Sequence, residues 1–149
     1  MDERFSGGLP PSLSPHPGLY QGLKGVQITH TSLVTAIRHW SAPSLIHTLP
    51  TEQFNQDIVS LGTHSAMTAM NIIELLRSAS AIALLAAAQA VDLRNGDIQN
   101  TPGRMGAGTR SIYHALRGAS AFVQADRALD TDIREVSGLI RGREIPALR

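Results

Sequence analysis

The sequence predicts an all-α protein built around long helices, and three observations lead to this class. No stretch of useful length alternates apolar and polar residues as a half-buried strand does. One helical pattern runs from about residue 62 to residue 93, and Asn95-Gly96 supplies a stop. Alanine is abundant between residues 79 and 90, and such small side chains favour a tight helix bundle. The length of 149 residues and the hydrophobic fraction of 42% suit a single helical domain over residues 1–149.

The N-terminal part divides into a loop and a helix. Residues 1–22 are dense in glycine and proline, which predicts an extended loop segment. Residues 24–41 show a helical spacing of apolar side chains, and Pro43 ends this pattern. The apolar stripe of the predicted helix consists of Val26, Leu33, Val34 and Ile37.

The helix predicted over residues 62–93 is long for a chain of this size. Thirty-odd residues at roughly 1.5 Å each span about 45 Å. A compact chain of this length has a radius of gyration of about 15 Å, so the helix exceeds the diameter of its own domain. Such a helix projects unless other helices cover it, and its length therefore predicts assembly. Met67 and Met70 lie on its apolar face and are predicted to be core residues.

The last third predicts a loop followed by two helices. Gly96, Gly103, Gly106 and Gly108 predict a loop up to residue 108. Helices are predicted over residues 109–123 and about 130–141, the second with Asp130 as its N-cap. Their apolar faces comprise Ile112, Ala115, Leu116, Ala119 and Phe122 in the first, and Ile133, Val136 and Ile140 in the second.

Charge and composition exclude several classes of partner. The formal net charge is +1, and the arginines of the last third are interspersed with acidic residues. This pattern predicts a solvated, salt-bridged face rather than a nucleic-acid surface. The uncharged run over residues 78–91 is shorter than the roughly 20 residues that cross a bilayer, so no membrane contact is predicted. The absence of cysteine and of a signal-peptide pattern fits a cytoplasmic protein, and the histidines lack metal-ligand spacing, so no metal site is predicted.

The most informative segment is the polar stretch that precedes the long helix. It surrounds the apolar Phe54 with acids and side-chain amides, namely Glu52, Asn55, Gln56 and Asp57. Such groups can fix the amino and carboxylate ends of a small zwitterion, or they can position neighbouring loops. The other interpretation is a satisfied polar junction where a helix begins. Spacing alone leaves both interpretations open.

Several motifs resemble those of the aromatic amino acid lyases, the family of histidine, phenylalanine and tyrosine ammonia-lyases and the related aminomutases. Residues 52–57, Glu-Gln-Phe-Asn-Gln-Asp, with Ser-Leu-Gly at 60–62, are similar to Glu-Gln-His-Asn-Gln-Asp and the following Ser-Leu-Gly of the plant phenylalanine enzymes. Residues 84–94, 8–11 and 126–133 resemble further family segments. The resemblance covers nearly the whole chain but only the C-terminal portion of a family member. It implies the C-terminal part of the ammonia-lyase helical fold.

The resemblance also identifies what this chain lacks. Family members carry a methylidene-imidazolone (MIO) electrophile that forms from an internal Ala-Ser-Gly tripeptide, and their catalytic base is a tyrosine in the N-terminal half. The sequence contains no Ala-Ser-Gly, and Tyr20 and Tyr113 lie outside matching motifs. Removing ammonia from an amino acid needs both an electron sink and a base. The chain alone is therefore expected to be inactive, with the MIO group supplied elsewhere.

The resemblance assigns roles to two groups of residues. It implies that Glu52 lies near the amino group of the substrate, while Asn55 and Gln56 organise the loops around the substrate and the electrophile. Lys24 and Ile28, one helical turn apart, are expected to line the aromatic pocket of the substrate. An ordinary solvent-facing lysine at a helix start remains the alternative for Lys24.

Two positions bear on the substrate. Phe54 stands where the plant enzymes have histidine, a change expected to reshape the pocket. Histidine lyases carry glutamate at the position of Gln56, whereas the phenylalanine and tyrosine enzymes carry glutamine, so the resemblance favours a neutral aromatic substrate. The predicted function is the C-terminal part of an ammonia-lyase for phenylalanine- or tyrosine-type substrates. Its expected partners are a complementary N-terminal lyase chain or homologous subunits. The alternatives are part of a 2,3-aminomutase, and a non-catalytic helical oligomerisation module or truncated remnant.

Overall fold

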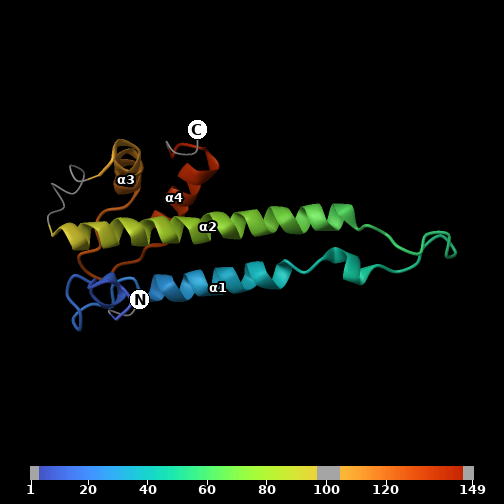
Figure 1. Ribbon diagram of the computed structural model, residues 1–149, viewed down its shortest axis with the longest axis horizontal. Coiled ribbons are helices and arrows are strands. Elements are labelled where there is room, and N and C mark those ends of the chain that lie inside the picture. Colours follow the sequence, from blue (N-terminus) through green and yellow to red (C-terminus); the bar gives the residue numbers. More distant parts are fainter. Residues whose placement is uncertain (1–3, 97–104, 146–149) are drawn as a thin grey trace.

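The computed structural model describes residues 4–96 and 105–145, and these contain four α-helices and no strand. The elements in chain order are a 3₁₀ turn at Pro11–Leu13, α1 (Lys24–Trp40), a 3₁₀ turn at Ser44–His47, α2 (Gly62–Asn95), α3 (Ala107–Ala119) and α4 (Asp130–Arg141). Figure 1 shows α1 and α2 side by side as a long hairpin, with α3 and α4 on the opposite side of α2 from α1. The all-α prediction is confirmed. Residues 4–22 are irregular apart from the first 3₁₀ turn, and most of the loop predicted after residue 96 lies outside the described residues.

Helix α2 organises the fold. It is 34 residues long, which corresponds to about 51 Å. It ends where Gly96 adopts a left-handed φ of 65° and donates its N–H to the carbonyl of Asp92 at 3.1 Å, a helix stop that glycine favours. By length and composition α2 is also able to cross a membrane, a weak indication because core helices of soluble proteins meet the same criterion.

The hydrophobic core surrounds only the C-terminal half of α2. All buried residues of α2 lie at or beyond Ala79. On one side, α2 packs against α3 and α4 through a cluster that comprises Ala81, Leu85, Ala88, Tyr113, Leu116 and Val136. A second cluster, which includes Leu13, Leu23, Val123 and Leu129, joins the N-terminal loop to the segment between α3 and α4. The alanines of α2 therefore sit where close helix packing requires small side chains.

The predicted C-terminal end of α3 is wrong. The helix ends at Ala119, and Ser120 is extended with φ −145° and ψ 120°. Val123, predicted to be helical, instead exchanges hydrogen bonds with the side chain of Gln89 on α2, at 3.0 and 3.1 Å. Because the backbone of Val123 bonds to this buried side chain instead of continuing the helix, α3 ends four residues earlier than predicted.

The start of α4 and its charged face also differ from expectation. Asp130 is the first residue of the helix rather than its N-cap, and its carboxylate pairs with Arg134 at 2.9 Å. That pair is exposed, as predicted. The pair between Arg127 and Asp132 is not a solvated surface pair, because Asp132 is buried and accepts two bonds, at 2.6 and 2.7 Å.

The Arg127–Asp132 pair predicts a pH dependence of stability. The hydrogen bonds from Arg127 lower the pKa of Asp132 from its ordinary value. A carboxyl group whose pKa is lower in the folded state contributes stability above its unfolded pKa of about 3.9, and this contribution is lost as the pH falls through the folded value. We therefore expect the free energy of unfolding of the wild type to decrease more steeply below about pH 4 than that of Asp132→Asn. Urea titrations followed by circular dichroism at several pH values measure this, with Asp130→Asn as the exposed control. Equal slopes for wild type and Asp132→Asn contradict the prediction.

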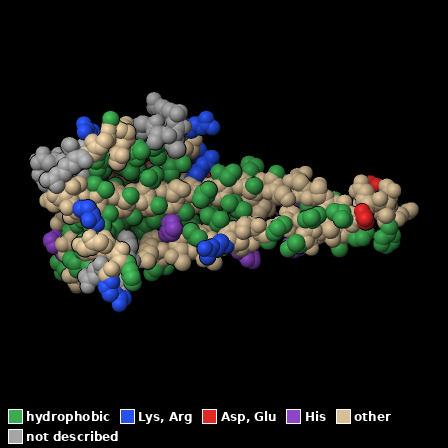
Figure 2. All heavy atoms as spheres, in the orientation of Figure 1, with side chains coloured by type: hydrophobic (Ala, Val, Ile, Leu, Met, Phe, Trp, Pro, Cys, Tyr) green, Lys and Arg blue, Asp and Glu red, His purple; other side chains and the backbone are tan. Residues whose placement is uncertain are grey.

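The other half of the α1–α2 hairpin projects from the core as an arm, defined here as residues 40–76 (Figure 1). No residue within 40–76 is buried. Its exposed large apolar side chains are Trp40, Leu45, Ile46, Leu49, Phe54, Ile58, Met67, Met70, Ile73 and Leu76. Figure 2 shows hydrophobic side chains along its length. Met67 and Met70 are 63% and 69% exposed, so their predicted core position is wrong within this chain. Monomers rarely expose apolar surface of this extent, so assembly along the arm stays a prediction.

Candidate functional site

The predicted site residues lie in two separate places. Lys24 and Ile28 belong to the first turns of α1, next to the core. The other group lies in the loop at the tip of the arm and comprises Glu52, Phe54, Asn55 and Gln56. Because α1 spans about 25 Å and the tip lies beyond its C-terminal end (Figure 1), the two groups of one chain do not meet.

The tip loop has an unusual backbone. The N–H of Thr51 donates to the carbonyl of Gln56 at 2.8 Å, and the N–H of Gln56 donates back at 3.3 Å, which closes the loop. Between them, Glu52, Gln53 and Phe54 have φ values of 51°, 54° and 66°. Each left-handed residue other than glycine costs about 1–2 kcal/mol. Such strained segments cluster at functional sites, so the backbone marks this loop as a candidate site independently of its sequence.

The polar side chains of the tip loop are exposed and loosely bonded. The amide of Asn55 donates to the carboxylate of Glu52 at 3.4 Å, and the hydroxyl of Thr51 donates to the side-chain oxygen of Gln56 at 3.5 Å. Both distances exceed those of strong hydrogen bonds. No side chain caps α2. The loop therefore does not cap the helix, and its acid and amide groups are exposed, where a ligand or another polypeptide can reach them.

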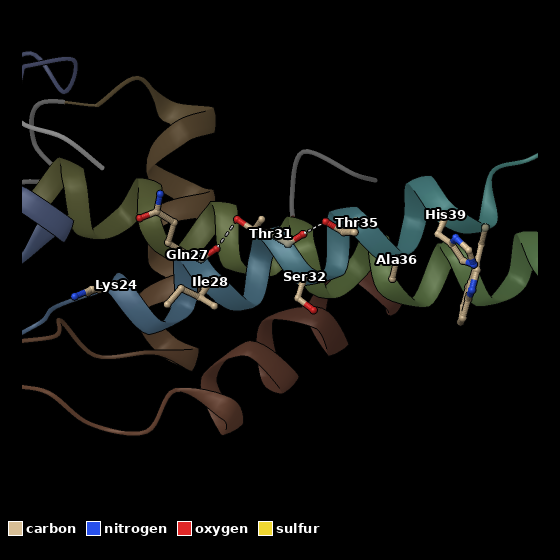
Figure 3. Close-up of a pocket in the computed structure, with 9 residues that line it drawn as sticks. Lys24, Gln27, Ile28, Thr31, Ser32, Thr35, Ala36 and His39 are labelled. Carbon is tan, nitrogen blue, oxygen red and sulfur yellow. Dashed lines mark hydrogen bonds between the residues drawn. The ribbon is translucent and has the colours of Figure 1, made fainter.

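The face of α1 that carries Lys24 and Ile28 is also open. An open hollow of about 860 Å³ runs along it (Figure 3). Ile28 is 65% exposed, and the ammonium of Lys24 donates to the side-chain oxygen of Gln21 at 3.4 Å. Ligand pockets measure about 300–1,000 Å³, so the size suits a small aromatic molecule. A single helix face supplies the lining residues, so a second polypeptide is needed to enclose a ligand.

A carboxylate from the far end of the chain fixes the start of α1. Asp126 accepts hydrogen bonds from the backbone N–H groups of Gln21 and Gly22, each at 2.9 Å. Gly22 has φ 57°, and a Cβ there lies 2.7 Å from the carbonyl oxygen of Ser12, so the position requires glycine. Sequence reasoning missed this anchor, because nothing in the local pattern connects positions more than a hundred residues apart.

Gln89 forms a second anchor. Its side chain is 1% exposed; its amide donates to the carbonyls of Leu13 and Val123 at 3.3 and 3.0 Å, and its oxygen accepts from the N–H of Val123 at 3.1 Å. It therefore holds the N-terminal loop and the segment after α3 against α2. A glutamine inside an alanine-rich helix is the sequence signal for such a buried polar contact.

Asp92, one turn further along α2, is the centre of a buried charged network. Its carboxylate is fully buried and accepts from the hydroxyl of Tyr113 and the guanidinium of Arg117, each at 2.5 Å. Burial raises the pKa of Tyr113, and the hydrogen bond to Asp92 raises it further. The network ties α3 to α2 on the side away from the tip loop. Its geometry gives it a structural role, and Tyr113 is not placed as a catalytic base for the predicted site residues.

The residues present do not form the MIO group. The sequence holds no Ala-Ser-Gly tripeptide, and the tip loop and the α1 face are both open. The MIO group that the resemblance implies would therefore have to be supplied by a polypeptide outside the residues of this sequence. Within residues 4–96 and 105–145, no three histidine, aspartate or glutamate side chains gather as a group that holds a metal ion.

Known proteins resemble this chain in sequence. The sequence family described as aromatic amino acid lyase matches residues 1–118. A hal-like protein of Dictyostelium discoideum is 44% identical over 142 residues, which are 94% of this chain and 26% of that protein. Histidine ammonia-lyase of Geobacillus kaustophilus is 34% identical over 143 residues, or 96% of this chain and 27% of that protein. The chain therefore spans about a quarter of the length of these relatives.

Solved structures of longer proteins contain a region with the same fold as this chain. Tyrosine aminomutase from Streptomyces globisporus superposes with a TM-score of 0.85 at 30% identity, over 99% of this chain and 27% of that one. Histidine ammonia-lyase from Trypanosoma cruzi superposes with a TM-score of 0.84 at 26% identity, over 99% of this chain and 28% of that one. The predicted long-helix fold is confirmed.

Proposed function

Because the chain belongs to the aromatic amino acid lyase family, we propose that it forms the C-terminal part of an aromatic amino acid ammonia-lyase. The remaining lyase polypeptide supplies the MIO group, which acts as the electron sink when ammonia is eliminated, and the catalytic tyrosine. The observation that supports the proposal is the strained and exposed tip loop, whose acid and amide groups make only long hydrogen bonds within the loop.

The roles of the tip loop follow from its chemistry. The carboxylate of Glu52 is available to accept hydrogen bonds from the amino group of a substrate. Asn55 and Gln56 each offer an acceptor and two donors, which suits the positioning of neighbouring loops around the bound amino acid. The exposed Phe54 adds an apolar contact beside them.

Two copies of the chain contribute to one active site in this proposal. The start of α1 and the tip loop lie at opposite ends of the hairpin (Figure 1), so a site that uses both takes them from different copies. Two arms that run antiparallel bring the tip of one copy to the α1 face of the other. The exposed apolar residues of the arm are then covered, which removes surface that is unfavourable in water.

Gln56 supports a neutral aromatic substrate of the phenylalanine or tyrosine type. An uncharged amide gives no electrostatic preference for a basic imidazole. Histidine is the second candidate substrate, because relatives such as the protein from Geobacillus kaustophilus are named histidine ammonia-lyases. The likeness to tyrosine aminomutase keeps an aminomutase part as a further alternative.

The direct test is reconstitution with a complementing lyase chain. We expect native mass spectrometry of the co-expressed chains to show a stoichiometric complex. We expect this complex to release cinnamate from phenylalanine or coumarate from tyrosine, measured by absorbance. Release of urocanate from histidine identifies the second candidate, and a β-amino acid product identifies an aminomutase. A complex with none of these products leaves a non-catalytic helical module.

Gln56 also provides a test of the substrate. We expect Gln56→Glu to raise kcat/KM for histidine relative to tyrosine about tenfold, equivalent to about 1.4 kcal/mol, because a carboxylate favours a basic ring. Gln53→Glu places the same charge in the same exposed loop and is the matched control. An equal change in both variants shows a general charge effect and contradicts a specific role of Gln56.

A further inference from the structure

Ser32 continues the line of Lys24 and Ile28 along α1. The three positions are four residues apart, and such neighbours lie on one helix face with their Cβ atoms about 5–6 Å apart. All three line the same open hollow. Figure 3 shows Ile28 and Ser32 on one side of α1, and Thr31 and Thr35 line the hollow as well.

The hydroxyl of Ser32 differs from the other hydroxyls of the helix. Those of Thr29, Thr31 and Thr35 each donate to the carbonyl four residues earlier, at 3.1, 3.0 and 2.9 Å. This local bond is the usual arrangement for a hydroxyl inside a helix. Ser32 makes no hydrogen bond within the part of the chain that the structure describes, and its side chain is exposed. Among the three hydroxyls that line the hollow, those of Thr31 and Thr35 are bonded within the helix, and that of Ser32 is free for a ligand.

The position of this hydroxyl matches the outer end of an aromatic ring. A ring that packs on Ile28 extends one turn, about 6 Å, toward Ser32. The phenol oxygen of tyrosine both donates and accepts hydrogen bonds, whereas phenylalanine offers nothing there. Once a second polypeptide closes the hollow, a phenylalanine ring leaves the serine hydroxyl buried without a partner, which is costly. Sites built to bond a substrate hydroxyl discriminate strongly against the analogue that lacks it.

We propose that Ser32 is a specificity-determining residue that selects tyrosine over phenylalanine by hydrogen-bonding the phenol oxygen. The proposal rests on the proposed function and narrows its substrate class. It is independent of the tip loop, because the selecting group lies on α1 and Gln56 distinguishes only neutral from basic rings.

The test compares Ser32→Ala with Ser32→Thr and Thr29→Ala in the reconstituted complex. We expect Ser32→Ala to lower the ratio of kcat/KM for tyrosine to that for phenylalanine about tenfold, the value of one hydrogen bond to a ligand group. Ser32→Thr keeps the hydroxyl and is expected to keep the ratio. Thr29→Ala removes a hydroxyl of the same helix away from the hollow and is expected to leave the ratio unchanged.

Binding of the products gives a second readout that does not need catalysis. We expect Ser32→Ala to weaken the binding of p-coumarate to the complex, measured by calorimetry, and to leave that of cinnamate unchanged. An active complex whose tyrosine-to-phenylalanine ratio does not respond to Ser32→Ala overturns the proposal. A complex that binds p-coumarate in a Ser32-dependent way but releases no ammonia overturns the proposed function and retains the assignment of Ser32. If the complex releases no ammonia and its binding of p-coumarate does not depend on Ser32, both the proposed function and the assignment of Ser32 are overturned.

Discussion

Asp92→Ala is expected to destabilise the chain by about 3–5 kcal/mol, the usual cost of removing one partner from a buried ion pair. The carboxylate of Asp92 is fully buried and is the acceptor for both Tyr113 and Arg117. Without it, the guanidinium of Arg117, whose side chain is only 14% exposed, loses its counter-charge inside the fold. The hydroxyl of Tyr113 loses its acceptor at the same time. Urea unfolding followed by circular dichroism measures the loss.

Two further variants separate the buried charge from the hydrogen bond. Tyr113→Phe removes one bond but leaves the ion pair, so we expect a loss of only about 1–2 kcal/mol. Asp130→Asn breaks an ion pair whose side chains are 74% and 71% exposed, and we expect almost no change. A loss below about 1 kcal/mol for Asp92→Ala, or a loss equal to that of Tyr113→Phe, contradicts the assignment of a buried charged network.

The helices were predictable where local sequence decides the backbone. α4 occupies residues 130–141 as predicted, and Gly96 stops α2 because glycine adopts the left-handed cap without strain. The end of α3 was not predictable, because Val123 satisfies its backbone through Gln89, which is 34 residues away. A periodic pattern carries no information about such a partner, and a buried side chain that offers hydrogen bonds overrides local propensity.

The candidate site shows the same division. The residue types single out Glu52 and Gln56, and the resemblance to the aromatic amino acid lyases singles out Lys24. The sequence does not reveal that the hairpin places Lys24 at one end and the tip loop at the other. Met67 shows the corresponding limit for packing. An apolar face identifies a surface that must be covered, but it does not specify whether the same chain covers it. Both differences concern the arm, none of whose residues is buried by the part of the chain that the structure describes.

Glu52→Ala is expected to lower kcat/KM of the reconstituted lyase at least about 100-fold, because the proposal assigns to this carboxylate the positioning of the reacting amino group. Ile28→Asp is expected to be equally damaging, because in the proposed site, which a second polypeptide encloses, it places a charge against the aromatic ring. Both residues are exposed in this chain, so neither change disturbs its core. Native mass spectrometry of each variant complex checks that assembly is intact.

Co-expression of these two inactive variants tests whether the α1 face and the tip loop of one site come from different copies. With random assembly, a site receives an intact α1 face with a chance of one half and an intact tip loop with a chance of one half, so about a quarter of the sites regain activity. If one copy supplied both groups, every site would carry one defect and no activity would return. Co-expression of Glu52→Ala with Gln56→Ala is the matched control, because both changes lie in the same tip loop and no mixed site is intact. Recovery in the first mixture and none in the second therefore demonstrates a shared site, whereas no recovery in either shows that the hairpin ends do not meet across copies.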